Sequence, residues 1–327
     1  MPVTPRVSVL MPVFNVAPYL KEAMDSILSQ TYEDFELIVL NDCSPDDSEA
    51  ILDMYADPRI VRYHGETNVG LANVLNVGIR MAKGEYIARM DSDDISLPTR
   101  LEAQVSYLDS HPEVDLVSAG MRKFGASEDI LVHRTDLEEV KFEAMTFSPI
   151  LHASSMWRKA RFMAENLYYK QEMVPSEDYD LWTRALVKGL VLINIPDILY
   201  KYRSHESQVT FTNKNWDKNS DIAFWYIESI FPGISKDAAQ RFRLLIWNEN
   251  PKEIKSVSQE IEKENSKVLF FNPISLHNRL KRNYQTRLYN QMLSNGIDIG
   301  VLFDLRLKQI IKLVINRVHD KCSHTSL

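Results

Sequence analysis

Apolar and polar positions in the first 120 residues alternate between two periods, one typical of buried strands and one typical of amphipathic helices. Five short runs rich in branched or aromatic residues predict strands, at Val7–Val13, Phe35–Leu40, Ile60–His64, Glu85–Met90 and Val114–Ala119. Because helical patterns separate these runs, the chain is expected to build a mostly parallel sheet with helices packed on it.

The expected helices cover residues 18–31, 44–55, 71–82 and 98–108. In the second of them, Ser44 is a candidate cap, Pro45 suits a first helical position, and two acidic residues follow in the first turn. Four of the ten glycines fall between residues 65 and 84, which indicates tight turns or close backbone approach there.

Beyond residue 120 the order is less regular. Leu137–Phe147 and part of Gln171–Lys188 predict helices, and Leu190–Tyr202 predicts a strand. From about Asp217 the pattern is helical, with breaks at residues 232–233 and 272–273. We therefore expect an α/β domain over residues 1–215 and an α-helical C-terminal extension over residues 216–327.

Composition excludes several classes of protein. With 327 residues, 45% of them hydrophobic and 25% charged, the chain has ordinary globular usage. A net charge of −7 argues against generic nucleic-acid binding. No apolar run approaches the ~20 residues of a membrane span. The N-terminus lacks a signal-peptide cleavage pattern, and two cysteines, Cys43 and Cys322, suit a reduced compartment. These features predict a cytoplasmic protein.

The charge is unevenly distributed. Residues 279–321 contain nine Lys or Arg and three Asp, a net charge of +6, which leaves −13 for the rest of the chain. Around Arg306–Arg317, basic and apolar residues interleave at helical spacing. Such a helix could lie on the surface of an anionic membrane, or it could pack on the α/β domain with its lysines in water.

Three carboxylates follow the fourth predicted strand, in Asp91-Ser92-Asp93-Asp94. They repel one another unless a cation neutralises them, and Mg²⁺ or Mn²⁺ bound by one or two carboxylates commonly shares its other positions with phosphates. A solvated acidic turn is the alternative. Phe14 and Asp42 follow the first two strands, so one sheet edge could offer an aromatic ring, a carboxylate and a metal to a nucleotide. Singly, Phe14 could instead be core and Asp42 a helix cap.

Four segments in this order resemble the nucleotide-binding half of family 2 glycosyltransferases, which have the GT-A fold: VSVLMPVFN, FELIVLNDCSPDDS, NVGLANVLNVGI and GEYIARMDSDDISLPTRLEAQ. The resemblance implies a Rossmann-like, mixed nucleotide-binding sheet with flanking helices. It also implies a nucleotide-binding half over residues 1–120 and an acceptor half over residues 121–215. Where many relatives have an arginine before the asparagine of the glycine-rich segment, this chain has Leu75 before Asn76, and Arg89 is the nearby basic alternative.

The resemblance assigns roles residue by residue. Asp42 resembles the base-recognising aspartate, Asp91 the residue that contacts ribose or a metal-bound water, and Asp93 the metal ligand. His205 resembles a histidine that some GT-A enzymes bring to the metal or diphosphate. The full set expected to bind the nucleotide sugar is Pro12, Phe14, Asn15, Asp42, Asn68, Asn76, Arg89, Asp91 and Ser92.

A second acidic motif, Ser176-Glu177-Asp178-Tyr179-Asp180-Leu181-Trp182, resembles the one that carries the family's general base, which places that role on Asp178. An acceptor hydroxyl is a poor nucleophile, and a nearby carboxylate can take its proton as it attacks. His152, Glu177 and Trp182 are the expected acceptor-binding residues. Without the motif order, a Glu-Asp pair at a helix start would simply complement the helix dipole.

The expected activity is inverting transfer of a sugar from a nucleotide diphosphate, such as UDP-GlcNAc, UDP-Gal or UDP-GalNAc, to a hydroxyl of a glycan or lipid-linked saccharide. The resemblance also implies Mn²⁺ or Mg²⁺ and a place in bacterial surface-polysaccharide synthesis. A sugar-phosphate nucleotidyltransferase is an alternative, but MPVFNVAPY has no glycine-rich, basic loop for a triphosphate. A non-catalytic nucleotide-sugar-binding protein is a second alternative, and it would need one of the acidic motifs to be broken.

Overall fold

The computed structural model describes residues 4–205, 216–247 and 251–295. The chain divides into two compact units, Met1–Tyr226 and Ile227–Leu327, and each is considered by itself below. The expected domain boundary near residue 215 lies outside the described residues. Helix α9 (Trp216–Ile230) crosses the division between the two units.

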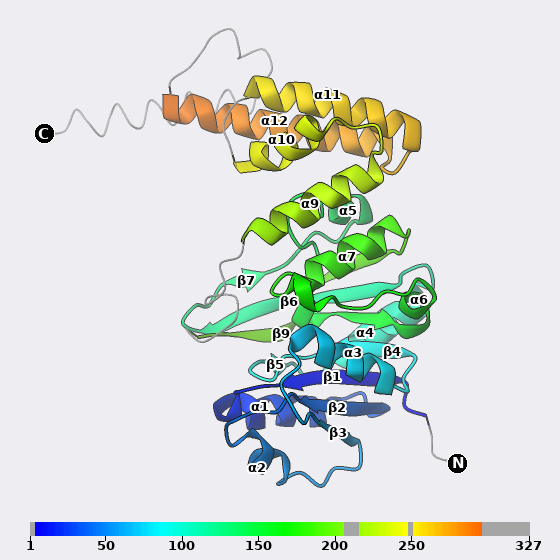
Figure 1. Ribbon diagram of the computed structural model, residues 1–327, viewed down its shortest axis with the longest axis vertical. Coiled ribbons are helices and arrows are strands. Elements are labelled where there is room, and N and C mark those ends of the chain that lie inside the picture. The colour runs from blue at the N-terminus through cyan, green and yellow to red at the C-terminus, as the bar shows by residue number, and fades with distance from the viewer. Residues whose placement is uncertain (1–3, 206–215, 248–250, 296–327) are drawn as a thin grey trace, which may run out of the picture. The chain divides into compact units, whose positions relative to one another are not determined.

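The first unit contains one mixed sheet, with nine strands in the described part of the chain (Figure 1). The strand order is β3-β2-β1-β4-β8-β6-β9-β5, and β7 pairs with β6. The strands are β1 (Val7–Val13), β2 (Phe35–Asn41), β3 (Ile60–His64), β4 (Tyr86–Arg89), β5 (Ile95–Ser96), β6 (Leu116–Gly125), β7 (Ile130–Leu131), β8 (Met156–Arg158) and β9 (Leu192–Ser204). The α/β sheet predicted from the sequence is confirmed.

Parallel pairing joins β1 to β2, β1 to β4 and β2 to β3. The sheet becomes mixed at β8, which pairs antiparallel with both β4 and β6. Strands β5, β7 and β8 have only two or three residues each, too few for a hydrophobic period to reveal them in the sequence. The carboxyl ends of β1, β2 and β4 meet at one edge, which brings together the residues that follow them.

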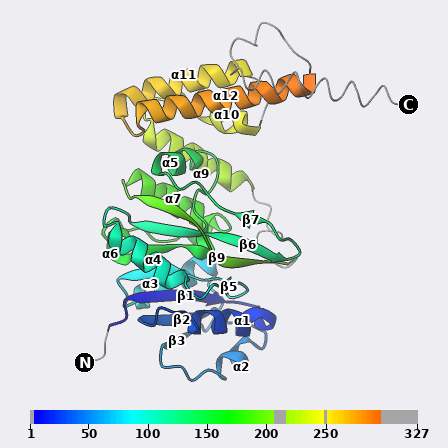
Figure 2. The same cartoon turned by 180° about the vertical axis from the view of Figure 1, so that it is seen from behind.

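Helices cover both faces of the sheet. Alternate residues of β1, such as Val9 and Met11, share a buried cluster with apolar residues of α1 (Ala17–Leu28) and α4 (Arg100–Ser110). On the other face, a Cβ at Gly78 of α3 (Leu71–Met81) would lie 2.6 Å from a Leu40 methyl carbon, so glycine lets this helix approach the sheet closely. Helix α3 lies on the near side in Figure 1, and α4 on the near side in Figure 2.

Four further helices and two 3₁₀ turns complete the list for residues 4–205. They are the helices α2 (Ser48–Leu52), α5 (Leu137–Glu143), α6 (Lys159–Ala164) and α7 (Glu177–Val187), with 3₁₀ turns η1 (His152–Ser154) and η2 (Gln171–Met173). Each α-helix predicted over residues 71–82, 98–108, 137–147 and 171–188 is present, although its ends differ by a few residues.

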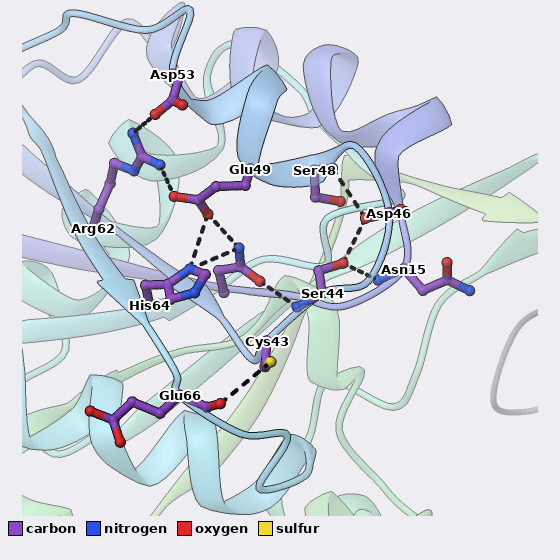
Figure 3. Close-up of polar contacts among 11 residues, drawn as sticks. Asn15, Cys43, Ser44, Asp46, Ser48, Glu49, Asp53, Arg62, His64 and Glu66 are labelled. Carbon is purple, nitrogen blue, oxygen red and sulfur yellow. Dashed lines mark hydrogen bonds and ion pairs between the residues drawn. The ribbon is translucent and has the colours of Figure 1, made fainter.

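The helix predicted over residues 44–55 is shorter than expected, because α2 begins only at Ser48. The Asp46 carboxylate accepts hydrogen bonds from the Ser44 hydroxyl at 2.6 Å and from the backbone N–H of Ser48 at 3.1 Å (Figure 3). It also accepts one from the backbone N–H of Ala17 at 2.8 Å. These bonds stabilise a turn that ties the end of β2 to α1, so residues 44–47 lie outside the helix.

The second unit is helical in its described part. Helix α10 (Lys236–Trp247) follows the break predicted at residues 232–233, and α12 (Pro273–Asn295) follows the one predicted at residues 272–273. The start of a separate helix, α11 (Pro251–Val268), was not predicted from the sequence. Among the described residues, no helix is both long enough and apolar enough to cross a bilayer. The basic amphipathic helix expected around Arg306–Arg317 lies outside the described residues, so its place is a prediction only.

Candidate active site

A cavity of about 450 Å³ in the first unit draws residues from distant parts of the chain. Its walls come from the end of β4, the acidic turn after it, β6, β9, the 148–153 segment and the start of α7. The predicted site residues that line it are Arg89, Asp91, Asp93, His152, Glu177 and Asp178. The two acidic motifs, more than 80 positions apart in the sequence, therefore share one cavity.

Arg89 binds the first acidic motif through Asp91. Its side chain is only 1% exposed, and Nη2 donates to Oδ1 of Asp91 at 2.5 Å. The backbone N–H of Asp91 donates to the Tyr200 hydroxyl at 3.0 Å, which fixes the turn to β9. Burying a guanidinium is costly unless it is paired, so the Asp91 carboxylate stabilises the charge of Arg89 inside the sheet.

Asp93 meets His205, which follows β9. Nε2 of His205 lies 3.0 Å from Oδ2 of Asp93. Arg203 holds the two segments together, because its backbone N–H donates to Oδ1 of Asp94 and its Nε donates to the backbone oxygen of Asp93, each at 2.7 Å. The acidic turn and the end of β9 are thus a single hydrogen-bonded unit.

Asp93 offers a carboxylate oxygen, which suits Mn²⁺ or Mg²⁺, and His205 offers an imidazole nitrogen, which favours a transition metal such as Mn²⁺ over Mg²⁺. Burial, and next the charge of Asp91, raise the pKa of Asp93, which a nearby cation would offset. Within the described ranges no three His, Cys, Asp or Glu side chains are grouped as a complete metal site. A protein contribution of one or two ligands fits a metal that takes its other ligands from water and a diphosphate.

Asp178 and Glu177 open α7 and face the same cavity. The hydroxyl of Ser148 donates to Oδ2 of Asp178 at 3.1 Å. Burial raises the pKa of Asp178 to about 6. Burial, and next the charge of Asp178, raise the pKa of Glu177 to about 7. Both carboxyls therefore titrate near neutral pH, where a general base is effective.

His152 lines the cavity, but its ring is engaged on two sides. Nε2 lies 2.8 Å from the Tyr169 hydroxyl, and the ring meets Trp182 edge-on at 6.0 Å between centroids. Burial, and next the charge of Arg89, hold the pKa of His152 well below its usual value, so the ring is neutral. His152 can offer an acceptor an uncharged polar contact.

Trp182, expected from the sequence to bind the acceptor, does not line the cavity. It is 0% exposed, and it packs edge-on against Trp157 at 6.0 Å and against Phe162 at 6.2 Å. Trp157 is also buried, at 1% exposure. The acceptor-binding role expected of Trp182 is therefore wrong in this structure, because hydrophobic packing takes both indole rings into the core.

The ends of β1 and β2 form a second group beside the acidic turn. Phe14 is 48% exposed, so its ring is available to a ligand. Asn15 has a left-handed backbone (φ 56°), and its N–H donates to the Ser44 hydroxyl at 2.7 Å. The backbone N–H of Asp42 donates to Val13 O at 3.0 Å, which keeps the two strand ends together.

Asp42 is only 3% exposed, and its carboxylate is already used by the backbone. Oδ1 accepts from the N–H of Val69 at 2.9 Å, and Oδ2 accepts from the N–H of Gly70 at 2.8 Å. Gly70 has φ 88°, a left-handed conformation that favours glycine. Asp42 therefore fixes the loop that leads into α3, in addition to any contact with a base.

Asn76 is also committed to the fold, which argues against its expected role at the nucleotide. Its Nδ2 donates to Tyr169 O at 2.8 Å, and its Oδ1 accepts from Tyr169 N at 3.0 Å. Pro12 is buried within β1 opposite Leu40, and Ser92 is 5% exposed. Asn68 is exposed. None of these four residues lines the cavity.

A polar network supports the loop after β2 (Figure 3). The Asn41 amide donates to Oε2 of Glu49 at 2.5 Å and accepts from the backbone N–H of Ser44 at 2.9 Å. Glu49 also pairs with Arg62, which reaches Asp53 at 2.7 Å. This network stabilises the loop conformation that presents Asp42 and Asn15.

Sequence reasoning missed Ser148, Tyr200 and Arg203. Ser148 has no motif around it, and only the fold brings it to Asp178. Tyr200 and Arg203 lie in YKYRSHE, beside the His205 that the resemblance identified. The alternation of this strand was a signal that could have placed the tyrosine under the acidic turn.

Comparison with known proteins agrees with this geometry. Residues 8–174 match the family described as glycosyl transferase family 2. EpsE of Bacillus subtilis (strain 168), named as a glycosyltransferase, is 33% identical over 226 residues, which cover 67% of this chain and 80% of EpsE.

Two solved structures share the fold. The crystal structure of S. aureus TarS 1–349 in complex with UDP-GlcNAc superposes with a TM-score of 0.62 at 19% identity, covering 90% of this chain and 93% of that one. The mannosyltransferase PcManGT from Pyrobaculum calidifontis, in complex with GDP-Man and Mn²⁺, superposes with a TM-score of 0.55 at 17% identity. The match covers 98% of this chain and 89% of PcManGT. The family match spans half of this chain and includes the DSDD turn that lines the cavity. This chain belongs to glycosyl transferase family 2 and is a glycosyltransferase.

Proposed function

We propose that this protein transfers a sugar from a UDP-sugar to a hydroxyl of a glycan or lipid-linked saccharide, with inversion at the anomeric carbon and with Asp178 as the general base. The observation that carries the proposal is the shared cavity. The acidic turn that would face the leaving diphosphate and the carboxyl that would face the acceptor line the same space.

The reaction follows from these positions. The Asp178 carboxylate takes the proton of the acceptor hydroxyl while the oxygen of that hydroxyl forms a bond to the anomeric carbon. The bond from the anomeric carbon to the diphosphate breaks at the same time. Ser148 orients Asp178 through its hydrogen bond to Oδ2. Glu177 and His152 hold the acceptor. One displacement from the face opposite the leaving group inverts the anomeric centre.

The donor would lie across the carboxyl ends of β1, β2 and β4. Phe14 stacks on the base, Asp42 accepts from the base, and Asp91 meets the ribose. A divalent cation held by Asp93 and His205, Mn²⁺ or Mg²⁺, would neutralise charge on the departing diphosphate. TarS, a structural neighbour over most of the chain, binds UDP-GlcNAc, which supports a uridine donor.

Residues 1–120 would form the donor half and residues 121–215 the acceptor half of this site. We propose that the enzyme works in the cytoplasm and takes part in bacterial surface-polysaccharide synthesis. There the enzyme would take a soluble donor and meet a saccharide acceptor at the membrane.

A thermal-shift panel of nucleoside diphosphates and nucleotide sugars, with and without Mn²⁺, tests the donor. Ligands that bind only the folded state raise Tm with concentration, so UDP or a UDP-sugar should give the largest metal-dependent shift. An equal shift with GDP would contradict the uridine preference. If no nucleoside diphosphate gives a shift, the proposed donor site is wrong.

Asp178→Asn tests the base. This variant should keep the UDP-induced thermal shift and lose at least about 100-fold in transfer rate, the typical contribution of a positioned base. The exposed carboxyl of Asp197 offers a matched control, and Asp197→Asn should transfer at the normal rate. Normal turnover in Asp178→Asn would remove Asp178 from this role.

A further inference from the structure

The turn between α11 and α12, in the second unit, carries apolar side chains on its outside. Val268, Leu269 and Ile274 are 42%, 66% and 74% exposed. Single exposed apolar residues are ordinary on protein surfaces. Three within seven consecutive positions form a patch, and such patches mark contact surfaces. We call residues 268–274 the hairpin tip.

The hairpin tip has a defined structure. Asn265 is 1% exposed, and its amide binds the backbone of Phe271 on both sides, at 2.9 Å to N and 3.0 Å to O. Oδ1 of Asn272 accepts the N–H of Ile274 at 3.0 Å, which caps the start of α12. Phe271 is buried and stacks on Phe231, with 6.0 Å between ring centroids. The exposed apolar side chains therefore project from a fixed turn.

Leu269 is an unusual residue at this position. Its φ is 52°, in the left-handed region where a helix normally ends with glycine or asparagine. A leucine here carries backbone strain, and because 66% of it is exposed, burial in the fold does not offset that strain. The fold would accept glycine or asparagine at this position, so a contact outside the chain accounts better for leucine.

Basic residues flank the hairpin tip. Residues 260–282, eight on each side of the tip, contain five Lys or Arg and three Glu, a net charge of +2 in a chain whose net charge is −7. All three acids are already engaged. Glu264 is only 3% exposed and pairs with Lys267 at 2.5 Å. Glu262 pairs with His277 at 2.8 Å, and Glu260 accepts from the backbone N–H of Ser235 at 2.6 Å. The surface around the tip is therefore cationic, and its partner is expected to be anionic. A second copy of the same cationic tip would be repelled.

We propose that the hairpin tip docks on an anionic lipid bilayer, with Val268, Leu269 and Ile274 in the interfacial layer and the flanking basic side chains at lipid phosphates. Apolar side chains and adjacent lysines supply the two attractions that interfacial binding combines. This contact is separate from glycosyl transfer, and it is also separate from the basic segment around Arg306–Arg317.

Sedimentation of the full chain with vesicles tests the proposal. Vesicles of phosphatidylcholine alone should bind little protein, and vesicles containing phosphatidylglycerol should bind it in a salt-sensitive way. The double variant Leu269→Asn/Ile274→Gln should bind anionic vesicles at least 10-fold more weakly. Asparagine suits the left-handed backbone at 269, so Tm should not fall. The matched control is Met54→Gln, which changes an equally exposed apolar residue (66%) of the first unit and should leave binding unchanged.

Several results would overturn the proposal. The first is wild-type protein that does not bind anionic vesicles, and the second is a double variant that binds them as strongly as wild type. The third is vesicle binding that is lost only in the tail variant Lys308→Gln/Lys312→Gln. Concentration-dependent self-association that the double variant abolishes would identify a second copy as the partner instead. The UDP-induced thermal shift, measured in parallel, is expected to stay the same in the double variant, so failure here is distinguishable from failure of the proposed transferase reaction.

Discussion

Nε2 of His205 lies 3.0 Å from Oδ2 of Asp93, although the two residues are 112 positions apart in the sequence. The pair exists because β5, next to the acidic turn, pairs antiparallel with β9, and because Arg203 binds the turn from the end of β9. Two potential metal ligands from distant positions in the sequence are thus held at a fixed separation by the fold itself.

Loss of either ligand should weaken metal-dependent nucleotide binding. We expect Asp93→Ala and His205→Ala each to weaken UDP binding in the presence of Mn²⁺ by at least about 10-fold, because losing a residue that only supports a metal ligand already costs about that much in metal affinity. Binding without Mn²⁺ should change much less. Calorimetric titration with and without the metal measures both, and His277→Gln in the second unit is the control. Equal losses with and without Mn²⁺ would show that the pair acts on the fold and not through a metal.

The Ser148 hydroxyl should set the acidic limb of the pH–rate profile. The base works when ionised, so kcat/KM should rise with pH through the pKa of Asp178, which is about 6. The hydrogen bond from Ser148 lowers this pKa, against the larger effect of burial. Ser148→Ala should therefore move the limb to higher pH and reduce activity more at pH 6 than at pH 8. If the acidic limb does not shift in Ser148→Ala, Ser148 does not influence the general base Asp178.

The same carboxyl should cost stability when it ionises. Burial raises the pKa of Asp178 from 3.8 to about 6, so the folded state binds its proton more tightly than the unfolded state does. Stability is therefore lost as pH rises from about 4 to about 6, and the cost persists above that range. Because Asp178 opens onto the cavity, we expect at most about 2 kcal/mol. Asp178→Asn should raise Tm at pH 8 and leave it unchanged at pH 4, as calorimetry would measure. A gain equal at both pH values would mean that ionisation is not its source.

The sequence predicted the strands and helices that have a regular hydrophobic pattern. The buried strand Val7–Val13 and the partly exposed edge strand Ile60–His64 were placed to the residue, because runs of branched and aromatic residues favour strands. Short antiparallel strands such as Met156–Arg158 were missed, because pairing between distant segments creates them. Motifs identified the carboxylates of the cavity. They could not show that Trp182, one helical turn after Asp178 and on the same side of α7, is buried, because the Trp157 and Phe162 rings that cover it come from other segments.

Asp42 should prove structural as well as ligand-binding. Removing its carboxylate leaves the N–H groups of Val69 and Gly70 without their acceptors, and a buried unpaired donor costs about 1–3 kcal/mol. Asp42→Ala should thus lower Tm in the absence of any nucleotide and also weaken UDP binding. Asp42→Asn, which keeps one acceptor oxygen, should lose less of both. If Asp42→Ala keeps the wild-type Tm and loses only UDP affinity, Asp42 contacts the nucleotide base and does not stabilise the fold.

Asn76 should affect stability and not donor binding directly. Its amide bridges α3 to Tyr169, and the Tyr169 hydroxyl in turn meets His152 at the cavity wall. Asn76→Ala removes both backbone hydrogen bonds at a 9% exposed site, so we expect a loss of about 2–4 kcal/mol, from two unmet groups of about 1–2 kcal/mol each. The matched control is Asn73→Ala, because Asn73 lies exposed on the same helix and its side chain makes a single hydrogen bond, to Val69 O at 2.9 Å. Thermal unfolding without ligand measures the loss. A normal Tm combined with weakened UDP binding would restore Asn76 to the nucleotide site.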